Sequence, residues 1–153
     1  MKTIVIVIAT ALLFLAGPPA QAMDGHGGMS GSGHASSGKD AMGFKHDTVV
    51  DGVRFEFQIM SLASMNMQDA QGRTHHIMVK MVDEDTRAEI KDAVGKIKII
   101  GPDGAEQVNT LENYSGIFAT NFSLPAQGKY GVICLLMVDG QKKLVRFWYD
   151  HKA

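Results

Sequence analysis

The sequence predicts an all-β domain, a sandwich of about seven antiparallel strands, and three observations support this. From residue 48 onward, short segments alternate apolar and polar residues with the period of two that half-buried strands require. Turn signals such as Asp51-Gly52 and Asp139-Gly140 separate several of these segments. No segment has a convincing helical period, because the best candidate, residues 83–93, offers only Ile90 as an apolar anchor.

Residues 1–22 have the features of a secretory signal peptide. Lys2 precedes an apolar run at 4–16 that is too short to cross a bilayer comfortably. The A-x-A pattern at 20–22 suits cleavage by signal peptidase. We therefore expect an exported, periplasmic protein that keeps no transmembrane segment after cleavage. An uncleaved membrane anchor is the alternative.

Residues 23–43 are dominated by Gly and Ser and offer little apolar surface to bury, which predicts a flexible tail. The tail nevertheless carries His26, His34 and three methionines. A plain spacer needs neither residue type, so we expect these histidines to capture metal. The alternative is a spacer whose histidines are incidental.

The predicted β-sandwich domain covers residues 44–153. After the hairpin turn at Asp51-Gly52, its expected strands are 53–60, 74–82, 94–100, 116–124, 130–138 and 142–150. Residues 130–138 are apolar on both faces, which predicts a central strand. Tyr130 follows a Pro/Gly-containing corner at the start of this strand. This placement is typical of a tyrosine corner, in which the phenol bonds back to the preceding loop, and it favours an immunoglobulin-like sandwich.

Charge and cysteine content exclude several classes of function. The formal net charge of the chain is −1, and removal of Lys2 with the signal peptide leaves it slightly more negative. This balance does not suit nucleic-acid binding, and the linear sequence shows no cluster of basic residues for anionic lipid. A single cysteine, Cys134, rules out an internal disulfide framework, and its apolar surroundings predict an inert buried side chain.

Histidine and methionine gather around the strand predicted at 74–82. Alternate residues of a strand lie about 6.7 Å apart on one face, so His76 and Met78 share a face while His75 points to the other. The loop at 61–73 is expected to bring Met65 and Met67 back toward the start of this strand. Thioethers with imidazole suit Cu(I) and suit zinc, calcium or magnesium poorly. The predicted copper site therefore contains His76, Met78, Met65 and Met67. His75 is an alternative ligand, a residue that supports the ligands from behind, or a rim residue without a role.

The alternative is that these methionines only pack, since Met is a flexible filler of apolar gaps. Met81 and Met137 are expected in the core, and Met60 under the loop. The sequence contains no G-x-S-x-G motif, no cysteine with a plausible base and no phosphate-binding loop, so we expect no enzyme.

The segments "THHIMVKMVDEDT", "VGKIKIIGPDG" and "LPAQGKYGV" give residues 48–150 a resemblance to the YtkA-like family of small exported immunoglobulin-like domains. The His76-Ile77-Met78 pattern is also similar to the H-x-M pair of some periplasmic copper carriers. This resemblance implies a β-sandwich that handles copper in the periplasm.

Together these features predict a periplasmic copper-binding protein, a Cu(I) carrier or copper-resistance factor. Its partners would be the copper ion and a copper-accepting membrane or envelope protein. The alternative is a non-metal protein-interaction module of a cell-envelope complex that presents a Met-rich surface.

Overall fold

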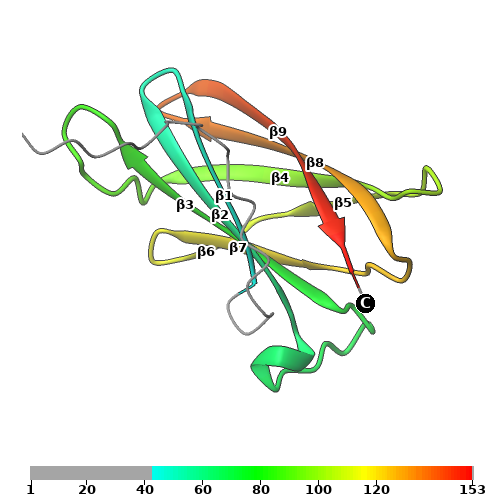
Figure 1. Ribbon diagram of the computed structural model, residues 1–153. Helices are drawn as coiled ribbons and strands as arrows, with labels where there is room; N and C mark the ends of the chain where they lie inside the picture. Colours follow the sequence, from blue (N-terminus) through cyan, green and yellow to red (C-terminus); the bar gives the residue numbers. More distant parts are fainter. Residues whose placement is uncertain (1–42, 153) are drawn as a thin grey trace, which may run out of the picture. The chain divides into compact units, whose positions relative to one another are not determined.

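The computed structural model describes residues 43–152, so the predictions for the signal peptide and for most of the tail lie outside the described residues. The chain forms two antiparallel sheets (Figure 1). The five-stranded sheet has the order β1 (Phe44–Val50), β2 (Val53–Ser61), β3 (His75–Asp83), β7 (Ile117–Phe122) and β6 (Glu112–Tyr114). The four-stranded sheet has the order β5 (Glu106–Thr110), β4 (Ala93–Ile100), β8 (Gly128–Val138) and β9 (Gln141–His151). The predicted all-β sandwich is confirmed.

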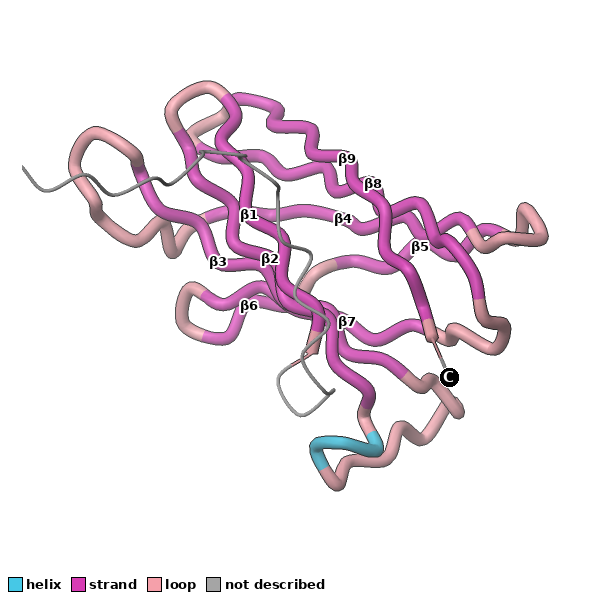
Figure 2. Tube along the Cα trace, in the orientation of Figure 1, coloured by secondary structure: helices cyan, strands magenta, loops and turns pink. Residues whose placement is uncertain are grey.

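The described part of the chain has two more strands than expected, β5 and β6. In β5 every second residue is exposed, and its one apolar residue, Val108, points outward. In β6 all three residues are exposed. Neither strand buries an apolar face, so the alternation that reveals a strand in a sequence is absent from both. Within residues 43–152 the one short helical element, η1 (Ala63–Met65), lies in the loop after β2 (Figure 2).

The two sheets enclose one apolar core built from alternate residues of the long strands. On β3 these residues are Ile77, Val79 and Met81, all with 0% exposure, as the alternation predicted. Each large apolar side chain that is fully buried contributes about 1.5–3 kcal/mol, so this core is the main source of stability. The other strands place the following residues in it: Phe55, Phe57, Ile59, Ile97, Ile99, Phe118, Phe122, Val132, Cys134, Leu136, Val145 and Phe147.

Two hairpin turns lie where the Asp-Gly pairs of the sequence predicted them. Asp51 and Gly52 both have positive φ angles, 46° and 76°, and so do Asp139 and Gly140, 49° and 74°. Consecutive positive φ angles define the turn whose twist matches a tight β-hairpin, which is why Asp-Gly recurs there. These turns join β1 to β2 and β8 to β9.

The tyrosine corner is present. The Tyr130 hydroxyl donates to the Ala126 carbonyl oxygen at 2.8 Å, and the Ala126 amide donates to the Tyr130 oxygen at 3.2 Å. These two bonds pin the corner that leads into β8, which is the predicted central strand and lies between β4 and β9. Cys134 is buried there, as predicted, and burial raises the pKa of its thiol to about 12. Met137, expected in the core, is only half-buried, because its side chain lies on the outer face of β8.

Candidate metal centre

The two adjacent histidines of β3 lie on opposite faces of the five-stranded sheet. His75 shares the inward phase of Ile77 and is 7% exposed, whereas His76 is half-buried on the outer face with Met78. The pleat of a strand alone requires this separation. His76 and Met78 thus lie together as predicted, and His75 lies apart from them.

The strand register adds a methionine to this outer-face pair. Met60 of β2 is the direct partner of His76 on β3, and Gln58 is the direct partner of Met78. Side chains that lie directly opposite in an antiparallel pair have Cβ atoms about 4.5–5.5 Å apart. Met60, His76 and Met78 therefore occupy neighbouring positions on one surface. The pleat of β2 puts Met60 on the outer face with Gln58, but only the register of β2 against β3 identifies it as the neighbour of His76.

A chain of hydrogen bonds holds the His76 ring. His76 Nδ1 lies 2.7 Å from Asn121 Oδ1, on the neighbouring strand β7. Asn121 Nδ2 in turn donates to Asp69 Oδ2 at 2.9 Å, so the amide oxygen is the atom that faces His76. Because an amide oxygen only accepts, His76 Nδ1 carries the proton. The lone pair is then on Nε2, the arrangement that metal-binding histidines commonly have.

Asp69 anchors the far end of this chain. Arg73 donates to it from Nε at 2.9 Å and from Nη2 at 2.7 Å. The Arg73 guanidinium and the Asn121 amide hold the pKa of the Asp69 carboxyl well below its usual range. Asp69 therefore stays ionised and keeps Asn121 oriented toward His76.

The Met60 side chain lies over Gly43 in this structure. A Cβ added at Gly43 would lie 2.5 Å from Met60 Cγ, so only a glycine leaves room for the side chain there. Met60 Sδ accepts a weak hydrogen bond of 3.4 Å from Gln58 Nε2. A methionine has three rotatable side-chain bonds, which allow its sulfur to turn toward the neighbouring strand.

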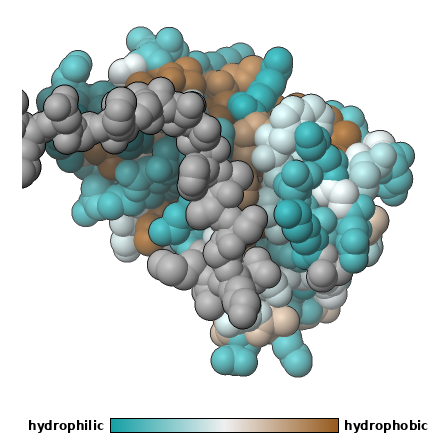
Figure 3. Space-filling view, in the orientation of Figure 1, coloured by the Kyte–Doolittle hydropathy of each residue, from teal (hydrophilic) through white to brown (hydrophobic). Residues whose placement is uncertain are grey.

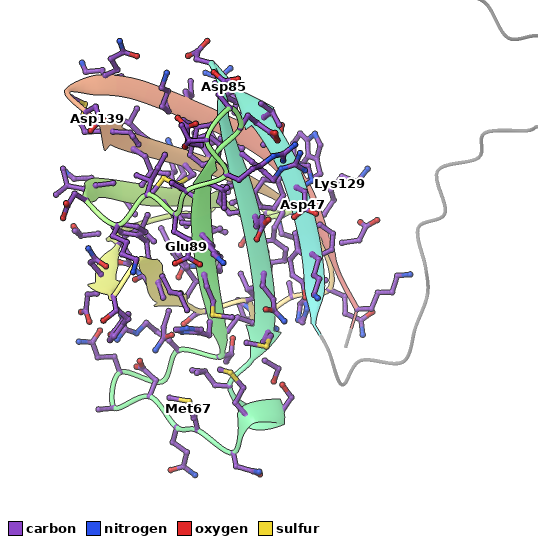
Figure 4. The ribbon with its side chains drawn as sticks, turned by 90° about the vertical axis from the view of Figure 1, so that its left-hand side faces the viewer. Asp47, Met67, Asp85, Glu89, Lys129 and Asp139 are labelled. Carbon is purple, nitrogen blue, oxygen red and sulfur yellow. The ribbon has the colours of Figure 1, made fainter. Side chains whose placement is uncertain are left out.

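Three of the predicted ligands line two different hollows. Met78 lines a hollow of about 370 Å³ on the outer face, together with Gln58 and Lys80. Met67 and His75 line another of about 490 Å³, formed largely by residues 61–74. Met67 lies in the loop between η1 and β3 and is 52% exposed (Figure 4). Met65 is half-buried in η1. His26 and His34 lie outside the described residues.

His75 belongs to an aromatic cluster at the end of the sandwich. Its ring meets the His151 ring of β9 edge to face, with centroids 4.7 Å apart, and its Nδ1 lies 2.9 Å from Thr74 Oγ1. Burial, followed by the nearby His151, lowers the pKa of His75 to about 4. His46 of β1 is half-buried, and its ring stacks on the Phe147 ring of β9 with centroids 4.3 Å apart. These contacts join the two sheets.

Among residues 43–152, no three His, Cys, Asp or Glu side chains converge as a metal site. In the same part of the chain, no helix is long and apolar enough to cross a membrane. No family model, curated protein or solved structure matches the chain.

Proposed function

We propose that this protein is an exported copper-binding protein, a Cu(I) carrier or copper-resistance factor. The metal would bind on the outer face of the five-stranded sheet through His76 Nε2 and the sulfurs of Met78 and Met60. The observation that carries this proposal is the hydrogen-bonded chain from Arg73 through Asp69 and Asn121, which holds His76 through Nδ1 on the strand face that it shares with Met78 and with its strand partner Met60.

The donor chemistry supports copper in the reduced state. One imidazole and two thioethers form a soft, uncharged set, which Cu(I) prefers and which Zn²⁺ does not. Cysteine would be the other soft ligand, but Cys134 is buried in the core, and burial raises its thiol pKa to about 12. The available soft donors on the outer face near His76 are therefore methionines.

The tail and the loop supply further candidate ligands. His26 and His34 would capture copper and raise its concentration near the domain, before transfer to a membrane or envelope acceptor. Met65 and Met67 remain predicted ligands from the loop after β2. Export, inferred from the signal-peptide pattern, explains the use of methionine, because exposed cysteines oxidise readily outside the cytoplasm.

An anaerobic Cu(I) titration in competition with a chromogenic chelator tests the proposal. The wild-type chain from Met23 onward is compared with a His76→Ala/Met78→Ala variant and with single Met60→Ala, Met65→Ala and Met67→Ala variants. Met137→Ala is the matched control, because Met137 is also a half-buried methionine of an outer face but lies on the other sheet. A chain that lacks residues 23–42 measures the contribution of the tail.

We expect one Cu(I) per domain, with competition lost in the double variant, weakened in Met60→Ala and unchanged in Met137→Ala. If the wild-type domain does not compete with the chelator, the methionines serve packing. The rival function, a non-metal interaction module of an envelope complex, would then be favoured.

A further inference from the structure

The outer face of the four-stranded sheet carries an exposed apolar stripe. Its centre is β8, where Ile133, Leu135 and Met137 alternate with buried core residues. The register places Val94 beside Met137, Leu144 beside Leu135 and Trp148 beside Gly131. Five apolar residues of this face are strongly exposed: Val94 at 69%, Trp148 at 65%, Val108 at 56%, Leu144 at 43% and Leu135 at 41%. Apolar surface gathers over the region of β8 and β9 (Figure 3).

The Trp148 ring lies beside Gly131, its direct partner on the neighbouring strand β8. A Cβ added at Gly131 would be 3.3 Å from Trp148 Cζ3, so the missing side chain of Gly131 makes the seat for the indole ring. Trp148 is 65% exposed, so its ring lies at the surface of this face.

Basic residues flank the stripe on both sides. The strand phase places five cations on this face, with only two anions. The cations are Lys96, Lys98, Lys129, Lys142 and Arg146, and the anions are Glu106 and Asp150. Lys98 pairs with Glu106 at 2.7 Å, and Asp150 is the direct strand partner of Lys129. Within residues 43–152, Lys96, Lys142 and Arg146 form no ion pair.

This face has the opposite charge from the rest of the described domain. The other residues between 43 and 152 carry eight Lys and Arg against twelve Asp and Glu. The domain is therefore polarised, with its positive charge gathered around its most apolar surface.

We propose that the outer face of the four-stranded sheet docks on an anionic phospholipid membrane. Lys96, Lys142 and Arg146 would meet lipid phosphates, while Trp148 and the β8 stripe enter the interfacial region. Trp and basic residues are the side chains that favour the membrane interface, and buried apolar area with attraction to anionic lipid sets the strength of such binding.

Charge selects this occupant over a second copy of the chain. Face-to-face pairing of two copies would bring two positively charged surfaces together, and the like charges would oppose it. An anionic bilayer would pair its phosphates with the cations and would also bury the apolar stripe in its interfacial region.

Trp148 is the only tryptophan of the protein, so its fluorescence reports on this face alone. The full mature chain is titrated with vesicles of phosphatidylglycerol and phosphatidylethanolamine, and separately with phosphatidylcholine vesicles. We expect a blue shift of the emission and co-sedimentation with the anionic vesicles only, weakened by salt.

A Lys96→Glu/Arg146→Glu variant should bind the anionic vesicles at least about tenfold more weakly. The matched control, Lys45→Glu/Lys91→Glu, makes the same change of net charge at two exposed lysines outside this face and should bind as the wild type does. Wild-type protein that shows no emission shift with anionic vesicles would overturn the proposal, and so would equal binding by the two variants. Concentration-dependent dimerisation that is lost in Leu135→Asp would instead assign the face to a second copy. The readout needs no copper, so this result is independent of the proposed function.

Discussion

His75 and His76 are neighbours in the sequence but occupy different environments. His75 points inward at the end of the sandwich and contacts His151 of the other sheet, and burial lowers its pKa to about 4. His76 points outward, is held through Nδ1 by Asn121 and lies across from Met60. The comparison shows that residue type does not decide a role on a strand. The phase of the pleat makes one histidine a contact between sheets and the other a candidate ligand.

The largest expected effect is on copper binding. His76→Ala removes the only imidazole of the outer-face site, and we expect the Cu(I) affinity to fall by at least about a hundredfold. This is more than the loss of a residue that only hydrogen-bonds to a ligand usually costs. His75→Ala, the control one residue away, should keep the wild-type affinity in the same chelator competition. Equal losses in both variants would remove the distinction between the two histidines.

The same two substitutions should affect the stability of the domain in the opposite order. His75→Ala leaves a cavity against His151 and Thr74, and we expect it to lower the free energy of unfolding by about 2–4 kcal/mol. His76→Ala, on the half-buried outer face, should cost less than about 1 kcal/mol. Urea unfolding of the metal-free proteins measures both values. A larger loss in His76→Ala than in His75→Ala would contradict the assignment.

The low pKa of His75 predicts a specific pH dependence of stability. The folded pKa is about 4 and the ordinary value is 6.5, so between these values the unfolded chain binds the proton and the folded chain does not. Stability is then complete above about pH 6.5 and falls as the pH drops toward 4, by about 2–3 kcal/mol from this group.

His46, whose pKa burial also lowers, adds to the same trend. Urea unfolding of the metal-free protein at pH 7, 5.5 and 4.5 measures the loss, and His75→Gln is the control that should flatten the profile. An unchanged profile in this variant would assign the pH dependence to other groups.

The smallest expected effect concerns the residue that orients His76. Asn121→Ala removes the acceptor for Nδ1, frees the ring and its tautomer, and should weaken Cu(I) binding by about tenfold. Gln107→Ala is a suitable control. The Gln107 side chain also forms hydrogen bonds near β7, with the backbone of Ser123 just after the strand, but it does not contact His76. Wild-type affinity in Asn121→Ala would mean that the hydrogen-bonded chain from Arg73 does not support the ligand.

Much of the fold could be predicted from local pattern. The alternation in β2, β3 and β4 was sufficient to assign their buried faces, because a half-buried strand must present apolar residues at every second position. In β8 both faces are apolar in sequence, so its outward face, with Met137, could not be assigned in this way. The tyrosine corner and the Asp-Gly turns were equally local. β5 and β6 were not predicted because they are polar strands at the edges of their sheets and bury no apolar face of their own.

The site was predictable only where its residues share a strand. His76 and Met78 lie two residues apart, so strand geometry alone puts them on one face. Met60, Asn121 and Asp69 come from elsewhere in the chain, and only the pairing of β2, β3 and β7 brings them to His76.

The outer face of the four-stranded sheet shows most clearly what the sequence determines and what only the tertiary structure decides. By itself the sequence determined the class of fold, the inward and outward phase of strands that alternate clearly, such as β2, β3 and β4, and the pairing of one imidazole with one thioether. Along the linear sequence the basic residues are scattered and form no cluster that would suit anionic lipid. Tertiary structure decided that Lys96, Lys142 and Arg146 surround one apolar stripe, because neighbouring strands align residues that lie up to fifty positions apart in the chain.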